Sequence, residues 1–277
     1  MRLPRAHLLR ALLPSLPLLF HDAPPAQAAV KLSSGVEEIR KAASLIPGYG
    51  PPDIAFPAAF RGRWTVQSKV VDVKTPLGEE AAPKVELDEA RRLMAADQPL
   101  AFEARFLDLD GGGGVLIAND KSDGVALSAS TYSGTVIADR AFNAERRAAA
   151  QPGAAPLQDF TARWDATNPN VLTLSCRGNV VETKVTKRSY ESPFDGAFGT
   201  SEYARIADAG SEGVMAVPKI MASRVQTRYK WDGSGGDVRQ IEALELAQTF
   251  DPTATGFADL AGATPVLTVK SRLVLTR

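Results

Sequence analysis

The stretch "DFTARWDATNPNVLTLSCRGNVVETKVTKRSYE", residues 159–191, decides the fold class because it holds three strand-like runs in succession. Apolar and polar residues alternate with a period of two in 159–166 and 171–176, as is typical of strands with one buried face, and 180–191 follows as the third run. The linking segments "TNPN" (167–170) and "RGN" (177–179) are rich in residues that form hairpin loops. The stretch therefore predicts three consecutive antiparallel strands.

The same alternation extends in both directions along the chain. Further strands are predicted at 64–73, 100–109, 115–120, 125–130, 134–139, 223–231, 238–250 and 265–277. Helical spacing is found in three short segments, 30–45, 86–98 and 141–150. Closely spaced strands without long intervening helices predict a mainly β protein with a single antiparallel β-barrel, because closure removes exposed edges. A β-sandwich is the alternative.

The first 29 residues differ in character from the rest. Three arginines lie within residues 1–10, an apolar run occupies 8–20, and Ala26-Gln27-Ala28 follows, which is the order of an export signal. A disordered or transit-type leader is the alternative. The apolar run is far shorter than the roughly 20 residues of a membrane span, and no later segment is predicted to span a membrane. We expect a signal segment at 1–29, a helix and Pro/Gly arm at 30–57, and the barrel domain at 58–277.

The inventory of reactive side chains favours a role without catalysis. Lys plus Arg and Asp plus Glu each total 32, which does not favour nucleic acid as a partner. The two histidines, His7 and His21, both lie in the leader, so the mature chain has no imidazole base or metal ligand. Cys176 is the single cysteine and is expected to pack as a small apolar residue. The pair Asp108 and Asp110 lacks the closing glutamate of a calcium loop. We expect no metal and no cofactor.

The segment "FRGRW" (60–64) contains a Gly-x-Trp motif formed by Gly62 and Trp64. It resembles the signature of the lipocalin and wider calycin barrels, in which the tryptophan packs across the closed end and a C-terminal arginine lies over it. By alternation in the final "SRLVLTR", Arg277 shares a face with two leucines, so it is the expected partner and Arg272 the second candidate. The alternative is that Trp64 is an ordinary core residue.

The preceding arm, "IPGYGPPDIAFPAAF" (46–60), is rich in proline and glycine. Because proline fixes φ and cannot donate to a sheet, the arm is predicted to lie outside the sheet in an extended or turning conformation. Its apolar residues Ile54, Phe56 and Phe60 give it a surface to bury. We expect the arm to wrap under the barrel and bring Gly62 and Trp64 to the closed end.

Five blocks spread over nearly the whole mature chain resemble a known but uncharacterised family. They are "IPGYGPPDIAFPAAFRGRW" (46–64), "FGTSEYARIADA" (198–209), "ASRVQTRYKW" (222–231), "VRQIEALELAQTF" (238–250) and "KSRLVLTR" (270–277). The family is a domain of unknown function that occurs in plant and algal chloroplasts and in cyanobacteria. The resemblance implies a chloroplast protein of the thylakoid lumen, and it brings no catalytic residues with it.

Together these features predict a non-catalytic barrel that binds an apolar small molecule, such as a lipid or pigment, or that assists a protein of a photosynthetic membrane complex. The bulky residues expected to contact a ligand are Phe102, Phe106, Trp164, Tyr203, Tyr229 and Trp231. One alternative is an enzyme acting on an isoprenoid or pigment through carboxylate and tyrosine chemistry at Glu202, Tyr203 and Glu242. A second alternative is a purely structural lumen protein.

Overall fold

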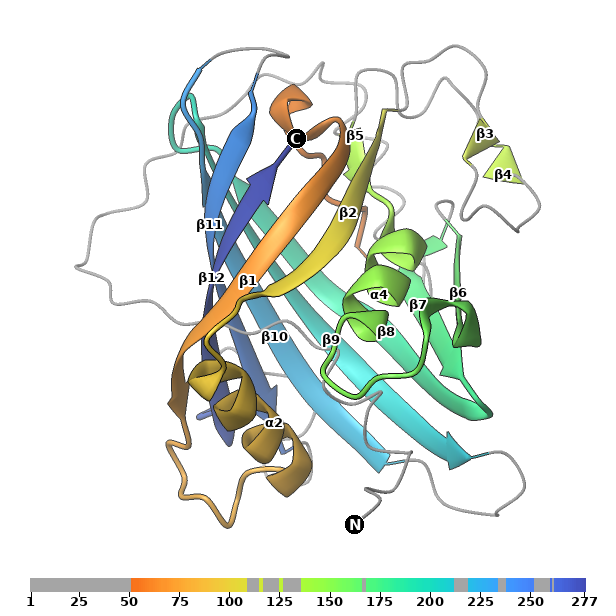
Figure 1. Cartoon of the computed structure of the whole chain (residues 1–277), viewed down its shortest axis with the longest axis vertical. Helices are drawn as coiled ribbons and strands as arrows, with labels where there is room; N and C mark the ends of the chain where they lie inside the picture. The colour runs from red at the N-terminus through yellow and green to blue at the C-terminus, as the bar shows by residue number, and fades with distance from the viewer. Residues whose placement is uncertain are drawn as a thin grey trace.

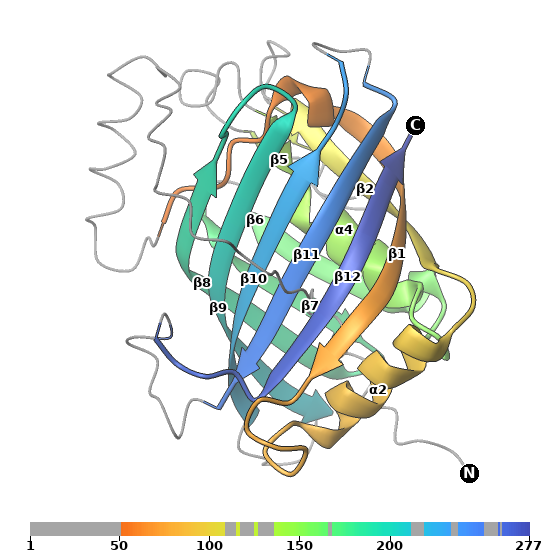
Figure 2. The ribbon, with the colours of Figure 1, turned by 90° about the vertical axis from the view of Figure 1, so that its left-hand side faces the viewer.

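A computed structural model describes residues 51–108, 115–116, 125–126, 136–165, 168–211, 219–233, 238–251, 260 and 262–277. One ten-stranded antiparallel sheet dominates it and curls into a half-barrel (Figures 1 and 2). Its order is β5-β2-β1-β12-β11-β10-β9-β8-β7-β6, and a separate two-stranded ribbon pairs β3 with β4. The prediction of a mainly β chain with an antiparallel, barrel-like sheet is confirmed.

Most strands lie where they were predicted, but β9 forms in a segment for which no strand was predicted. Their bounds are β1 (Gly62–Lys74), β2 (Leu100–Asp108), β3 (Val115–Leu116), β4 (Val125–Ala126), β5 (Val136–Ala138), β6 (Phe160–Asp165), β7 (Asn168–Cys176), β8 (Asn179–Glu191), β9 (Ala197–Ser211), β10 (Lys219–Lys230), β11 (Gln240–Phe250) and β12 (Leu267–Thr276). Strands β6 to β12 form an up-and-down meander, and β12 then pairs with β1, with Val66 opposite Leu275.

The two hairpins of the opening stretch differ in their agreement with the prediction. Arg177 and Gly178 have φ values of 49° and 83°, so the predicted turn between β7 and β8 is present with the two left-handed residues that a tight hairpin needs. The prediction of a loop at 167–170 is wrong in part, since β7 already begins at Asn168. The register between β6 and β7 shifts after Trp164, so Pro169 enters the strand where no ladder partner faces it.

Two α-helices accompany the sheet at the predicted places. Helix α2 (Lys84–Ala95) packs its Leu87 and Ala90 against Val70 and Val269 of β1 and β12. Helix α4 (Arg140–Ala149) begins directly after β5, and the carboxylate of Asp139 caps it by accepting the Phe142 N–H at 3.0 Å. The helix predicted at 30–45, the leader and Asp110 lie outside the described residues.

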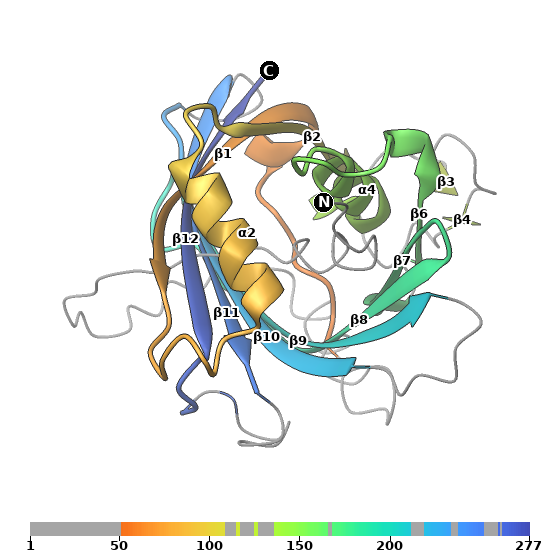
Figure 3. The same ribbon diagram turned by 60° about the horizontal axis from the view of Figure 1, so that its bottom comes forward.

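Helix α4 joins the two edges of the sheet, which strand pairing leaves apart (Figure 3). On one side the Asn143 amide accepts the backbone N–H of Arg105 in β2 at 2.7 Å and donates to the Arg105 carbonyl at 3.2 Å. On the other side the Glu145 carboxylate accepts the N–H of Ala162 in β6 at 2.7 Å. The helix and its side chains therefore bridge the open side of the half-barrel, because unpaired edge groups need partners when they are buried.

One end of the half-barrel is filled by aromatic side chains and sealed by the chain terminus. Trp64 is 1 % exposed and donates its indole N–H to the Phe60 carbonyl at 2.6 Å. The Arg277 guanidinium carbon lies 4.3 Å from the Trp64 ring centroid, and its nitrogens donate to the carbonyls of Val238 and Arg61 at 2.7 and 2.6 Å. Phe56 and Phe60 of the arm are packed here, and Phe60 is fully buried against neighbouring rings.

Candidate functional site

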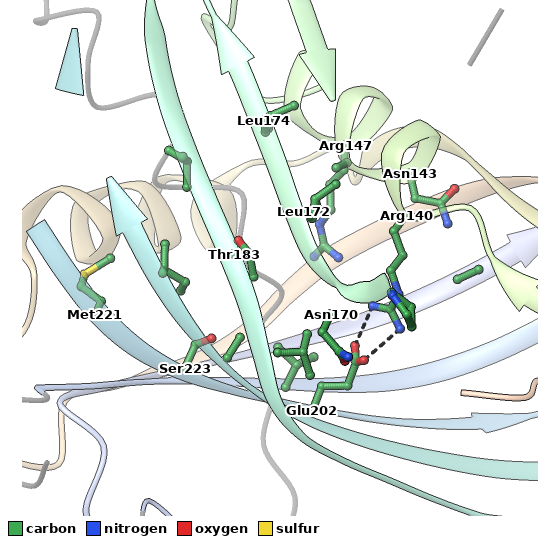
Figure 4. Close-up of a pocket in the computed structure, with 18 of the residues that line it drawn as sticks. Arg140, Asn143, Arg147, Asn170, Leu172, Leu174, Thr183, Glu202, Met221 and Ser223 are labelled. Carbon is green, nitrogen blue, oxygen red and sulfur yellow. Dashed lines mark hydrogen bonds and ion pairs between the residues drawn. The ribbon is translucent and has the colours of Figure 1, made fainter. Parts of the chain in front are cut away.

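A cavity of about 250 Å³ lies under α4, against the inner faces of β7, β8, β9 and β10 (Figure 4). Its apolar wall consists of Ala138, Ala144, Leu172, Leu174, Val181, Val185, Ala204, Ile206, Met221 and Val225. Its polar wall consists of Arg140, Asn143, Arg147, Asn170, Thr183, Glu202, Asp208 and Ser223, together with Pro169. Apart from Pro169, the wall residues of β7 to β10 fall at every second position, because a period of two sends them to the concave face.

The first turn of α4 places Arg140 at one side of the cavity. Its nitrogens lie 3.1 and 2.9 Å from the two carboxylate oxygens of Glu202, as the dashed lines of Figure 4 mark. They also lie 3.3 and 2.5 Å from the two oxygens of Asp53, which belongs to the N-terminal arm. Arg140 therefore bridges the arm and strand β9 through paired, charge-assisted hydrogen bonds.

Arg188 of β8, which lies opposite Glu202 in the ladder of β8 and β9, is a second cation bonded to that carboxylate. Its Nε donates to the Glu202 carboxylate, one Nη lies 2.7 Å from the Asn170 amide oxygen, and the other lies 2.7 Å from the Pro169 carbonyl. A further bond of 3.2 Å reaches the Pro51 carbonyl. The side chain is only 3 % exposed, so nearly all of its donors face protein groups.

These contacts decide the ionisation of the site. Burial alone would raise the pKa of Glu202, but the charges and hydrogen bonds of Arg140 and Arg188 outweigh it and lower that pKa to about 2. Burial likewise opposes the charge of Arg140, yet Asp53 and Glu202 raise its pKa above the ordinary value. Glu202 thus stays a carboxylate across the physiological range and has no proton to donate.

A second buried ion pair lies beside the cavity. Arg147, one helical turn after Asn143, contacts both oxygens of Glu245 in β11 at 3.1 and 2.8 Å, and its guanidinium stacks over the Phe102 ring at 5.4 Å. Burial raises the pKa of Tyr229, and the nearby Glu245 charge adds to the effect. The acidic and basic groups here neutralise one another as they do around Glu202.

The side chains predicted to contact a ligand occupy other places. Phe106, Tyr229 and Trp231 belong to the aromatic cluster around Phe60, and Phe102 borders it. Trp164 packs in the core that α4 forms with β6 and β7. None of the six is among the described side chains that line the cavity. Their role in binding stays a prediction.

The positions considered for carboxylate and tyrosine chemistry do not converge. Glu202 faces the cavity, whereas Tyr203 is the next residue of β9 and points to the other face, where it packs with Phe250 and under Arg224 at 5.0 Å. Glu242 is exposed on β11. Arg272 is exposed on β12, and it is Arg277 that lies over Trp64.

Sequence reasoning missed most of the buried charges. Glu245 carried a readable signal, because it alternates onto the same face as Ala243 and Ala247. Arg188 carried none, since a register shift between Val185 and Lys187 turns it inward against the alternation.

Within the described residues no three His, Cys, Asp or Glu side chains gather as metal ligands. No helix of the described segments is both long and apolar enough to cross a bilayer. Residues 48–277 match the family model described as a domain of unknown function, DUF6816. Neither the curated proteins nor the solved structures include a match to the chain.

Proposed function

The chain belongs to the DUF6816 family, a domain of unknown function, and we propose from its site that it is a non-catalytic binding protein that holds a small apolar molecule in its half-barrel. The observation that carries the proposal is the cavity under α4. Its wall is largely aliphatic, and the arginines that reach it, Arg140 and Arg147, are each bonded to carboxylates. An apolar wall with a few placed polar groups is the usual make-up of a ligand pocket.

The volume limits the size of the bound group. An apolar cavity of about 150 Å³ holds benzene, whereas drug-sized ligands occupy roughly 300–1,000 Å³. At about 250 Å³ the cavity fits one ring with short substituents or a short stretch of acyl chain. A lipid or pigment would therefore place one end group here and leave the remainder outside the cavity.

The ionisation of the site weighs against the alternative of an enzyme with carboxylate chemistry. A general acid or base needs a pKa near the working pH. The pKa of Glu202 lies at about 2, and both of its oxygens are engaged by arginines. Glu202, the one of the three residues considered for this chemistry that faces the cavity, therefore cannot serve as a proton carrier.

The proposed location is the thylakoid lumen of the chloroplast. It is supported by the basic, apolar and small-residue order of positions 1–29 and by the resemblance of the sequence blocks to a chloroplast and cyanobacterial family. The test is uptake of the full chain by isolated chloroplasts, followed by protease protection of thylakoids before and after lysis. Degradation before lysis would contradict a lumenal location.

The binding proposal is tested by purifying the full chain natively from thylakoids and identifying co-eluting lipids, pigments and proteins by mass spectrometry. We expect a small apolar molecule that the Ala204→Leu variant does not retain, because Ala204 lies on the cavity wall. The matched control is Ala207→Leu, on the same strand but not on that wall. Recovery of a photosynthetic protein complex without any small molecule would refute the binding role and favour assistance to that complex.

A further inference from the structure

One wall residue, Ser223 of β10, has a polar group that the fold leaves unsatisfied. Its side chain is on the cavity wall and is 1 % exposed, and its Oγ has no hydrogen-bond partner among the described residues. Buried hydroxyls are usually paired, because an unpaired one loses its bonds to water without replacement. The position of Ser223 in the cavity is shown in Figure 4.

The surroundings of Ser223 explain why the protein does not satisfy it. Its neighbours on the same face of β10 are Met221 and Val225, and the residues opposite are Ala204 on β9 and Thr249 on β11. Only Thr249 among these has a side-chain oxygen, and it makes no hydrogen bond with the Ser223 hydroxyl. A ligand in the cavity is thus the group placed to accept a hydrogen bond from the hydroxyl.

The charged groups of the wall restrict the charge of that ligand. Arg140 is bonded to Asp53 and Glu202, and Arg147 is bonded to Glu245. An anionic ligand would have to displace one of these carboxylates, and it would also face the buried Asp208. A neutral ligand neither has to displace a carboxylate from an arginine nor is repelled by Asp208.

We infer that the ligand is a neutral, ring-sized molecule with a single hydrogen-bond acceptor, such as a carbonyl or ether oxygen, that accepts the hydroxyl proton of Ser223. This inference rests on the proposed binding function and names the class of ligand for the same cavity. The apolar body would lie along the aliphatic wall, and the oxygen would be directed at β10.

Three probes with the same number of non-hydrogen atoms test separately the need for a hydrogen-bond acceptor and the need for a neutral charge. They are cyclohexyl methyl ketone, isopropylcyclohexane and cyclohexanecarboxylate. Each is titrated into the full chain, its Ser223→Ala variant and its Ser271→Ala variant, with amide chemical shifts as the readout. Ser271 is the matched control, since it is equally buried but lies on β12 away from the cavity wall.

We expect Ser223→Ala to weaken binding of the ketone roughly tenfold and to change the affinity for the hydrocarbon less than about twofold. Ser271→Ala should leave both affinities unchanged, and the carboxylate should bind the wild-type chain most weakly. The melting temperature of ligand-free Ser223→Ala should equal or exceed that of the wild type, because no protein bond is lost.

The outcomes show whether a failure concerns this inference alone or the proposed binding function on which it rests. If neither the ketone nor the hydrocarbon binds the wild-type chain, the proposed function itself fails. If both bind and Ser223→Ala weakens them equally or not at all, only the hydrogen bond to the ligand is refuted. A carboxylate that binds as tightly as the ketone would refute the requirement for neutrality, and a lower melting temperature for Ser223→Ala would show that the hydroxyl already has a protein partner.

Discussion

Replacing Glu202 with glutamine tests the buried charges around the cavity most directly. The folded protein lowers the pKa of Glu202 from its ordinary value of 4.5 to about 2, since Arg140 and Arg188 together outweigh burial. That is a difference of about 2.5 pH units, and at 1.36 kcal/mol per unit it corresponds to about 3 kcal/mol of stability. The side chain is 22 % exposed, so solvent screens the interaction only in part.

The sign of the pH dependence follows from the lowered pKa. A carboxylate that binds its proton less readily when folded stabilises the protein fully above its unfolded pKa, and this contribution is lost as the pH falls through the folded pKa. We therefore expect the stability gap between wild type and Glu202→Gln to be widest above about pH 5 and to narrow by about 3 kcal/mol towards pH 2. At neutral pH the variant also leaves Arg188 without its nearest carboxylate and with Asp53 at 3.9 Å, which should destabilise it by about 3 kcal/mol, the lower end of the range for a broken buried pair.

The assay is urea unfolding of the full chain at several pH values between 7 and 2.5, followed by tryptophan fluorescence and linear extrapolation. Glu242→Gln serves as the control, since Glu242 is an exposed carboxylate of β11. The free energy of unfolding of this variant should stay within about 0.5 kcal/mol of the wild-type value at each pH. A gap for Glu202→Gln that is constant with pH, or absent at pH 7, would refute the electrostatic reasoning.

Three further perturbations test the closure of the barrel and its core. Arg277→Ala should lower the free energy of unfolding by about 2 kcal/mol through loss of the stacking on Trp64 and of carbonyl partners, while Arg272→Ala changes it by less than about 0.5 kcal/mol in the same denaturation assay. Asn143→Ala should destabilise by about 1–3 kcal/mol and speed hydrogen exchange along the edge of β2, and unchanged exchange would contradict edge sealing by α4. Cys176, whose thiol pKa is raised by burial, should react with a thiol reagent only after unfolding, so rapid labelling of the native chain would exclude its packed position.

Most of the fold was readable from the sequence because its determinants are local, although no strand was predicted at β9. The alternation in 171–176 and the turn at Arg177 and Gly178 reappear in β7 and in the tight hairpin that joins it to β8. The helical spacing of 86–98 and 141–150 likewise predicts α2 and α4 to within a few residues. Such features depend on neighbours in the chain, so a single sequence reveals them.

The site was less readable because its residues meet through long-range contacts. Asp53 and Arg140 are 87 positions apart, and nothing in the sequence of either segment indicates their pairing. Arg188 faces inward only because β8 shifts register, and Asn143 and Glu145 look like ordinary polar helix residues until the sheet edges lie beside them. Alternation predicts the face of a regular strand, and it fails where a bulge intervenes.

The cavity is a space of about 250 Å³ that is partly open to solvent, and an apolar ligand that enters it removes its aliphatic wall from water. Part of the space exists because Ala144 of α4 and Ala204 of β9 are small. A ligand that refills it should restore packing, and at a hundred times its dissociation constant it should stabilise the folded chain by about 2.7 kcal/mol. Ala204→Leu should stabilise the ligand-free chain and abolish that gain, because the same atoms cannot occupy the space twice.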